Sequence, residues 1–285
     1  MDIESKLTIG DVARMTGVNP VTLRAWQRRF GLLAPTRTPK GHRLYSDADV
    51  QRIEAILSWL AKGVAISKVK PLLSQGAPAT TEQPDEWQGH IRQLDSAVLA
   101  LNSMQLHRVL DDVSALYPFR VLLRHLLQPW LTQLPLLLSE RPDGGLLTQW
   151  VHGQLWQRLS AIQMSRRGPL SARVVLLASA DDSGPAILAG LELAAQNIGW
   201  WLLSLSEAEQ LPLLAGRMPL DGLVLAAPAS MNASQQQVLT RSVAAMGLPL
   251  LCCGQFASLY ARQPGWQIIS SGELTAKLIL TGEQQ

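Results

Sequence analysis

Hydrophobic positions follow a helical period up to about residue 167 and then change to short, continuous apolar runs. One early stripe repeats every three to four residues and predicts an amphipathic helix over 47–62; it consists of Val50, Ile53, Ile56, Leu57 and Leu60. Runs such as 174–180 are as long as single strands, and they alternate with helical patterns. This alternation predicts a doubly wound parallel sheet in the last part of the chain.

Capping and turn residues predict a short first helix over 7–15. Thr8 is the expected N-cap, because Asp11 follows three residues later, where a capping box places an acidic side chain. Gly17 then provides the turn that separates this helix from the next one.

A second helix is expected to begin at Pro20 and to end before Gly31. Asn19 can cap this helix, and proline is tolerated at the first helical position because an N–H there would have no helical partner. Leu23 and Trp26 lie three residues apart and are expected on the inner face, in the core. Two helices joined by a short glycine turn predict a helix-turn-helix.

The segment after this pair predicts a wing and two further helices. Prolines and a glycine within 34–45 indicate a hairpin loop. Ser46 is the expected N-cap of the helix over 47–62, which Gly63 ends, and Ser67 opens a short helix that ends near residue 73.

The middle of the chain predicts a linker followed by helices. Residues 75–85 are rich in Pro, Ala, Thr and Gly and lack periodicity. From 86 to 167 the pattern is helical, with breaks expected near Pro118, Pro129 and 141–145. About four helices fit this length, which is enough for a small bundle.

Strand-sized apolar runs alternate with helical patterns after residue 171. The expected strands cover 172–180, 200–206, 221–229, 248–255 and 265–272, and the expected helices cover 186–199, 207–215, 232–247 and 273–282. The sheet formed by such strands is expected to be parallel and buried on both faces.

Charge is distributed unevenly along the chain. Residues 1–75 contain 12 Lys/Arg and 6 Asp/Glu, a net charge of +6, whereas the whole chain carries +3, so the remainder is mildly acidic. Residues 18–45 contain no acidic side chain. This balance favours a nucleic-acid-binding head on a control region, although a solvated basic surface would give the same charge.

The two cysteines, Cys252 and Cys253, are adjacent, a spacing that rarely allows them to pair with each other. We expect buried, reduced thiols in a reducing compartment. The N-terminus does not resemble a signal peptide, and the longest apolar runs are far shorter than a membrane span. The expected location is the cytoplasm, with no membrane partner.

A set of short motifs runs through residues 7 to 74. They are Thr8-Ile9-Gly10, Ala13, Gly17-Val18, Thr22-Leu23-Arg24, Gly31-Leu32-Leu33, Pro35 and Gly41-His42-Arg43 with Tyr45. Together they resemble the MerR family of bacterial transcription regulators, which act by distorting an over-long promoter spacer. The stretch AWQRR stands where the commonest family pattern has Tyr-Tyr-Glu-Arg. This departure resembles a branch whose C-terminal half looks like a cobalamin-binding domain.

Side chains on the second helix and the wing are the candidate DNA contacts. Thr22 and Arg24 lie near the helix N-terminus and are expected at base edges, whereas Arg28 and Arg29 are expected at phosphates. The full candidate set is Thr8, Asn19, Val21, Thr22, Arg24, Arg28, Arg29, Arg37, Lys40, His42, Arg43 and Tyr45. The alternative role for Arg24 is a structural ion pair with Asp11.

In the branch that this chain resembles, a helical bundle caps a flavodoxin-like domain whose loop histidine ligates cobalt. Aligning the final glycine of that loop motif on Gly190 places Ile187 at the histidine position, and isoleucine has no lone pair. The bundle motif Trp-x9-Glu-His, started at Trp150, ends on Ser160 and Ala161. We therefore predict that the chain binds no cobalamin and no metal. Cobalamin binding without a histidine ligand is the one alternative that stays open.

The predicted fold is an α+β multidomain chain. Its parts are a winged helix-turn-helix over 1–74, a linker over 75–85, a cobalamin-cap-like helical bundle over 86–167, and a flavodoxin-like (Rossmann-type) domain over 172–285 that lacks the ligand histidine.

The predicted function is a sequence-specific DNA-binding regulator without catalytic residues. The resemblance implies a homodimer on palindromic double-stranded promoter DNA, an indirect effect on RNA polymerase, and kinship with the MlrA-like branch linked to curli and biofilm genes. The C-terminal region is expected to respond to a protein partner or a non-corrinoid signal.

Two alternatives to this function stay open. One is a cobalamin-dependent photosensor that represses transcription, and the other is a corrinoid carrier or enzyme component. Asp181 and Asp182 are the one tempting carboxylate pair for an enzyme. Consecutive residues at a strand end point apart, so we interpret them as a solvated loop.

Overall fold

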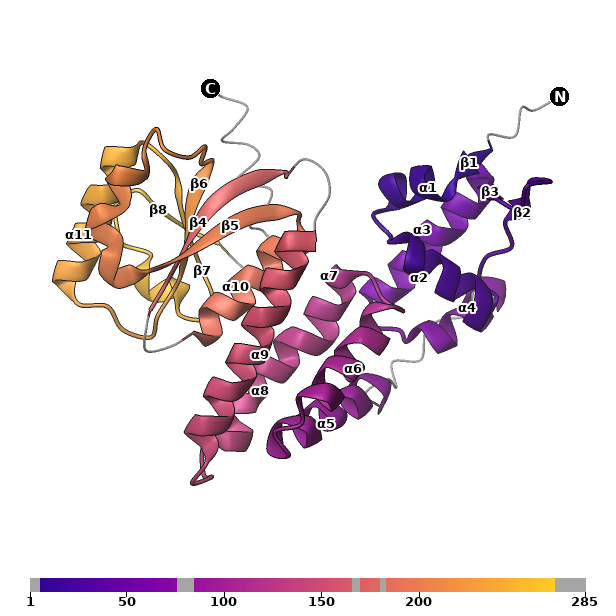
Figure 1. Ribbon diagram of the computed structural model, residues 1–285, viewed down its shortest axis with the longest axis horizontal. Coiled ribbons are helices and arrows are strands. Elements are labelled where there is room, and N and C mark those ends of the chain that lie inside the picture. The colour runs from indigo at the N-terminus through magenta and orange to yellow at the C-terminus, as the bar shows by residue number, and fades with distance from the viewer. Residues whose placement is uncertain (1–5, 76–84, 166–169, 180–182, 270–285) are drawn as a thin grey trace. The chain divides into compact units, whose positions relative to one another are not determined.

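The computed structural model describes residues 6–75, 85–165, 170–179 and 183–269 (Figure 1). The chain divides into two compact units, Met1–Leu137 and Leu138–Gln285. Three expectations lie wholly or largely outside the described residues: the linker over 75–85, the Asp181–Asp182 pair and the closing helix over 273–282.

Residues 6–75, called the head below, contain three short strands and four α-helices, one of which runs on into a π-helical turn. In chain order these are β1 (Leu7–Thr8), α1 (Ile9–Thr16), α2 (Pro20–Ala25), η1 (Trp26–Phe30), β2 (Thr36–Arg37), β3 (Arg43–Tyr45), α3 (Asp47–Ala61) and α4 (Ile66–Gln75). The predicted helix-turn-helix and wing are confirmed. The structure adds β1, which pairs antiparallel with β3.

Side-chain caps begin the head helices where the sequence predicted. Thr8 and Asp11 form a capping box on α1, and Ser46 and Asp49 form one on α3. The side chain of Asn19 accepts a 2.8 Å hydrogen bond from the Val21 N–H at the start of α2. Each cap satisfies an N–H that has no partner within the helix, which typically contributes about 1 kcal/mol.

The second helix ends in a π-helical turn that sequence periodicity does not reveal. The prediction was one α-helix up to Gly31, but α2 changes into η1 at Trp26. The Trp26 carbonyl accepts from the N–H groups of both Gly31 and Leu32, and these longer-range bonds widen the final turn. Gly31 closes the turn with φ of 58°, a left-handed conformation that suits glycine.

The first unit continues with helices α5 (Asp85–Leu99), α6 (Ser103–Ser114), α7 (Phe119–Leu122), η2 (Leu123–Leu127) and α8 (Gln128–Leu138). The predicted break at Pro118 is confirmed, because this residue is the N-cap of α7. The predicted break at Pro129 is wrong, since the chain stays helical from α7 through α8. The π-turn η2 ends at Leu127, two residues before this proline, and a widened turn of this kind is one way for a helix to continue past a missing N–H.

The second unit contains a long helix and a parallel sheet. Its elements are α9 (Gly144–Ser165), β4 (Ala172–Ala178), α10 (Gly184–Ala195), β5 (Ile198–Ser204), η3 (Leu205–Leu214), β6 (Gly222–Ala226), α11 (Ala233–Met246), β7 (Leu250–Cys253), η4 (Ala257–Tyr260) and β8 (Trp266–Ile268). All neighbouring strands pair in parallel, in the order β5-β4-β6-β7-β8, which confirms the predicted parallel sheet.

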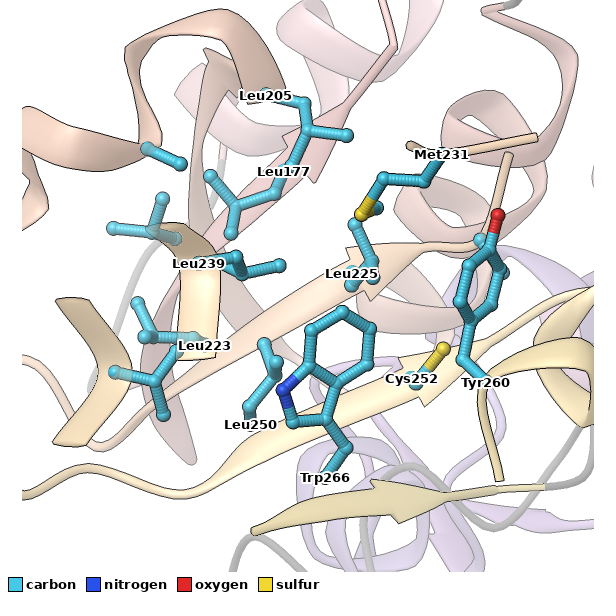
Figure 2. Close-up of a cluster of buried hydrophobic side chains, with 14 of the residues drawn as sticks. Leu177, Leu205, Leu223, Leu225, Met231, Leu239, Leu250, Cys252, Tyr260 and Trp266 are labelled. Carbon is cyan, nitrogen blue, oxygen red and sulfur yellow. The ribbon is translucent and has the colours of Figure 1, made fainter. Parts of the chain in front are cut away.

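One hydrophobic core of the second unit lies between the sheet and the pair η3 and α11. Alternate strand residues point to this face, as the two-residue period of a strand requires. Figure 2 shows the packed side chains, which include Leu177, Leu205, Leu223, Leu225, Met231, Leu239, Leu250, Cys252, Tyr260 and Trp266. Each fully buried leucine contributes about 1.5–3 kcal/mol by leaving water.

Helix α10 lies against strands β4, β5 and β6 and also packs on α9. Gly190 allows close contact with α9, because a Cβ at this position would lie 3.3 Å from Cδ1 of Leu159. The helix predicted over 207–215 forms instead as the 3₁₀-helix η3 over Leu205–Leu214. Pro212 lies inside it and cannot donate the N–H that a regular α-helical turn needs there.

Candidate nucleic-acid interface

Helix α2 and the turn η1 present arginines on one side and bury apolar residues on the other. Arg24, Arg28 and Arg29 are exposed. Leu23 and Trp26 are 0% exposed, which confirms their predicted core positions. The buried residues hold the backbone in place while the long guanidinium side chains extend into solvent, as a helix that enters a DNA groove requires.

The wing places further basic side chains beside this helix. Arg37, Lys40 and His42 are exposed on the β2–β3 hairpin. Arg43 is half-buried, because its Nε donates a 2.7 Å hydrogen bond to Oε1 of Gln27 in η1. A side-chain hydrogen bond thus connects the hairpin with α2 and η1, which together are called the recognition helix below. The exposed basic side chains of the recognition helix and the hairpin are called the basic surface.

Two residues of the predicted contact set lie in the core instead. Thr22 is 2% exposed and Tyr45 is 1% exposed. The Tyr45 hydroxyl is buried without a hydrogen-bond partner, and burial raises the pKa of this phenol. Neither side chain can reach DNA without leaving the core, so we assign both to packing and leave them out of the proposed contacts.

Thr8 and Asn19 are exposed, but their side-chain oxygens already serve as helix caps. Val21 is 54% exposed at the start of α2, where its side chain could make an apolar contact with a base.

The alternative ion pair between Arg24 and Asp11 is not formed. Asp11 instead binds Arg14, with 2.6 Å between Nη2 and Oδ1, and the hydrogen bonds from Thr8 are the main cause of its lowered pKa.

The electrostatic balance of this surface favours a polyanion. No acidic residue occurs between Asp11 and Asp47, a stretch that includes the recognition helix and the wing. Asp11, at the start of the stretch, is engaged in its capping box and ion pair, and Asp49, two residues after its end, is engaged in the capping box of α3. The exposed arginines are therefore free of neighbouring carboxylates in the sequence and suit phosphate oxygens.

Residues 7–76 match the family model described as MerR HTH family regulatory protein. The head therefore matches the MerR family of helix-turn-helix regulators. This confirms the family that the motifs indicated, and the matched range covers the head described above.

Curated relatives extend the MerR-family similarity beyond the head. The HTH-type transcriptional regulator MlrA of Salmonella typhimurium and of Escherichia coli is 45% identical over 125 residues, which is 43% of this chain and 49% of the relative. The HTH-type transcriptional repressor CarH of Myxococcus xanthus is 30% identical over 181 residues, 57% of this chain and 59% of the relative. The chain thus spans about half the length of its MlrA relatives.

The positions predicted to replace a cobalt ligand do not fit a ligated cobalamin. Ile187 is 0% exposed within α10 and offers no lone pair to a metal. Ser160 and Ala161 lie exposed on α9. Within the described residues, no group of three or more His, Cys, Asp or Glu side chains is arranged to hold a metal ion.

A contact that the sequence did not predict lies where α9 meets the start of α10. Nδ1 of His152 is 2.7 Å from Oγ of Ser183. His152 lies in α9, before the first strand of the sheet, and the fold brings it beside Ser183, the N-cap residue of α10. No local signal joins residues 31 positions apart, so only the packing of α9 on α10 reveals this pair.

The two cysteines behave as the sequence predicted. Cys252 and Cys253 are buried and free in β7. Burial raises the pKa of the Cys252 thiol to about 12, and burial followed by nearby Glu192 raises that of Cys253. Thiols held protonated in this way are inert at neutral pH.

Among the described residues, no helix is both long enough and apolar enough to span a membrane.

Proposed function

We propose that this chain is a sequence-specific, DNA-binding transcriptional regulator of the MerR family. One observation carries the proposal: the recognition helix and the wing, joined by the Gln27–Arg43 hydrogen bond, present exposed basic side chains around a buried apolar core. The proposed contacts are Val21, Arg24, Arg28, Arg29, Arg37, Lys40, His42 and Arg43, with Thr8 and Asn19 at the edge of the surface. Arg24 reads base edges, and the remaining basic groups bind phosphates.

The working form is a homodimer on a palindromic promoter in the cytoplasm, because a two-fold operator calls for two heads in two-fold symmetry. RNA polymerase is affected indirectly, through the shape of the bound promoter. The second unit serves as the control region and responds to a protein partner or a non-corrinoid signal. The strand order β5-β4-β6-β7-β8 supports a flavodoxin-like fold for its sheet. No catalytic role is proposed for it.

The test starts by selecting duplexes from a random pool with the full-length chain. Affinity for the enriched duplex and for a scrambled duplex is then measured by fluorescence anisotropy over a range of salt concentrations. With about six to eight phosphate contacts per dimer, the logarithm of the affinity should fall with the logarithm of salt with a slope of about −5 to −7. Failure to enrich any sequence, or equal affinity for both duplexes at every salt concentration, would rule out the proposal.

A further inference from the structure

The recognition helix is held by a contact from far along the chain. The Trp26 side chain is 0% exposed, and its Nε1 donates a 2.8 Å hydrogen bond to the carbonyl of Leu116, 90 residues away. This carbonyl belongs to the turn between α6 and α7. A buried indole N–H needs an acceptor, and here the acceptor comes from the helical part of the first unit rather than from the head.

The next residue of the same turn holds a second point of the head. The Tyr117 hydroxyl accepts a 3.1 Å hydrogen bond from the Ile66 N–H, at the start of α4, and donates a 3.0 Å hydrogen bond to Oε1 of Glu86 in α5. Oε2 of Glu86 accepts from Ser67 Oγ at 2.9 Å. Two consecutive residues of one turn, Leu116 and Tyr117, therefore bind both the recognition helix and the start of α4.

Aromatic packing holds the end of α3 to the same helices. Nε1 of Trp87 donates a 2.9 Å hydrogen bond to the carbonyl of Gly63. The Trp87 ring lies 4.7 Å from that of Tyr117 and is stacked on His125, with 5.8 Å between the ring centroids. A ring nitrogen of His125 lies 3.2 Å from the Ala61 carbonyl. We refer to these contacts between the head and helices α5 to η2 as the junction; they are made by Trp26, Glu86, Trp87, Tyr117 and His125.

The junction leaves the basic surface open, because it uses the inward side of the recognition helix. Trp26 lies between Arg24 and Arg28, both of which are exposed. Its side chain is bonded to the α6–α7 turn, and its own carbonyl accepts the N–H groups of Gly31 and Leu32 that shape the π-turn. A displacement of Trp26 would thus move the guanidinium groups on both sides of it relative to the wing.

We propose that Trp26 is a positioning residue for DNA recognition, and that the α6–α7 turn sets the geometry of the recognition helix through it. The proposal rests on the proposed DNA-binding function and adds a route for its control. Any partner or signal that moves this turn changes the placement of Arg24 and Arg28 without touching the DNA. Helices α5 to α8 then contribute to DNA recognition through this turn.

The test compares Trp26→Phe with Trp130→Phe in the full-length chain. Both tryptophans are 0% exposed and both donate an indole hydrogen bond, but Trp130 donates to Oδ1 of Asp95 between α8 and α5, away from the head. Each variant therefore loses one indole hydrogen bond, to a backbone carbonyl in Trp26→Phe and to a carboxylate in Trp130→Phe. Affinities for the enriched duplex and for a scrambled duplex are measured together with the thermal unfolding midpoint.

Trp26→Phe should lose roughly three- to tenfold in affinity for the enriched duplex, the size expected for one net hydrogen bond, and keep its affinity for the scrambled duplex. Trp130→Phe should be destabilised at least as much, because its lost bond is to a carboxylate, and should discriminate as the wild type does. An equal loss on both duplexes, an unchanged preference in Trp26→Phe, or the same loss in Trp130→Phe would overturn the inference. If the wild type itself shows no preference, the proposed function fails instead.

A second variant keeps the test decisive if Trp26→Phe does not fold. Tyr117→Phe retains the ring that packs on Trp87 and removes only the hydroxyl that contacts Ile66 and Glu86. It should also lower the preference for the enriched duplex. When both variants fold, their combined effect should be smaller than the product of the single effects, because both release the same turn. Independent effects, or no effect of Tyr117→Phe, would contradict the proposal.

Discussion

Nε of Arg43 in strand β3 donates a 2.7 Å hydrogen bond to Oε1 of Gln27 in the recognition helix. The bond spans 16 residues and connects the wing with the helix that carries Arg24, Arg28 and Arg29. The Nε atom of Arg43 thus holds the wing to the helix, and this bond does not use the other guanidinium donors. A fixed angle between wing and helix lowers the ordering cost when both meet one DNA duplex.

Replacing Gln27 with Ala should therefore loosen the wing without changing any charge. We expect a loss of roughly two- to fivefold in affinity for the enriched duplex and of at most about 1 kcal/mol in stability, as for one net hydrogen bond. Gln51→Ala, at an exposed position of α3, is the matched control and should change neither quantity. Anisotropy titrations and urea unfolding measure both, and a wild-type affinity in Gln27→Ala would show that the wing needs no such restraint.

Arg24 is expected to read bases rather than phosphates. Arg24→Ala should weaken binding to the enriched duplex by about 1–3 kcal/mol and affect the scrambled duplex much less, because a bidentate contact to a base pair is lost. Arg217→Ala removes the same charge at an exposed site of the second unit and serves as the control. If Arg24→Ala weakens both duplexes equally and lowers the salt slope by about one, then Arg24 contacts phosphate only.

Replacing Tyr45 with Phe should lower neither the stability of the protein nor its affinity for DNA. Because this hydroxyl has no hydrogen-bond partner and the ring is 1% exposed, Tyr45→Phe removes an unsatisfied polar atom and keeps the packing. Stability should be unchanged or higher by up to about 1 kcal/mol, and DNA affinity should stay at the wild-type value. Chemical denaturation checks the first expectation and anisotropy the second. A clear loss of DNA affinity would return Tyr45 to the contact set.

Local chemistry made much of the head predictable. The capping boxes of Thr8 with Asp11 and Ser46 with Asp49, and the Asn19–Pro20 start, depend on residues close together in sequence, and the structure has each of them. The parallel sheet followed from apolar strands that alternate with helices. These signals act within a few residues, so a single sequence contains them in full.

Long-range packing explains what the sequence did not show. The π-turn after Trp26, the helix that continues through Pro129 and the pair His152–Ser183 all depend on contacts or adjustments that periodicity cannot encode. Thr22 was placed at the DNA surface because its position in the helix suited a base contact, whereas the fold buries it. The sequence therefore placed the arginines of the second helix correctly on the exposed side, and it misjudged the exposure of Thr22 and Tyr45, which depends on tertiary packing.

The junction also predicts how the stability of the first unit depends on pH. Burial lowers the pKa of His125 below its ordinary value, and nearby Arg124 acts in the same direction, although the bond to the Ala61 carbonyl opposes it. In the unfolded chain this histidine takes up a proton near pH 6.5, whereas in the folded chain it does so only at lower pH. Between these two values the unfolded state binds more protons, so folding weakens as the pH falls through that window.

The urea midpoint of the wild type should therefore drop when the pH is lowered from 7.5 to 5.5, and His125→Asn should drop less because asparagine does not titrate. Asparagine can also keep a donor near the Ala61 carbonyl, which limits other effects of the substitution. The comparison uses the difference between the two pH values within each protein, so a general destabilisation of the variant cancels. If the wild type and His125→Asn lose the same amount, the proton is taken up elsewhere. If His125→Asn loses more, protonation of His125 stabilises the folded state, and its contact with the end of α3 strengthens with charge.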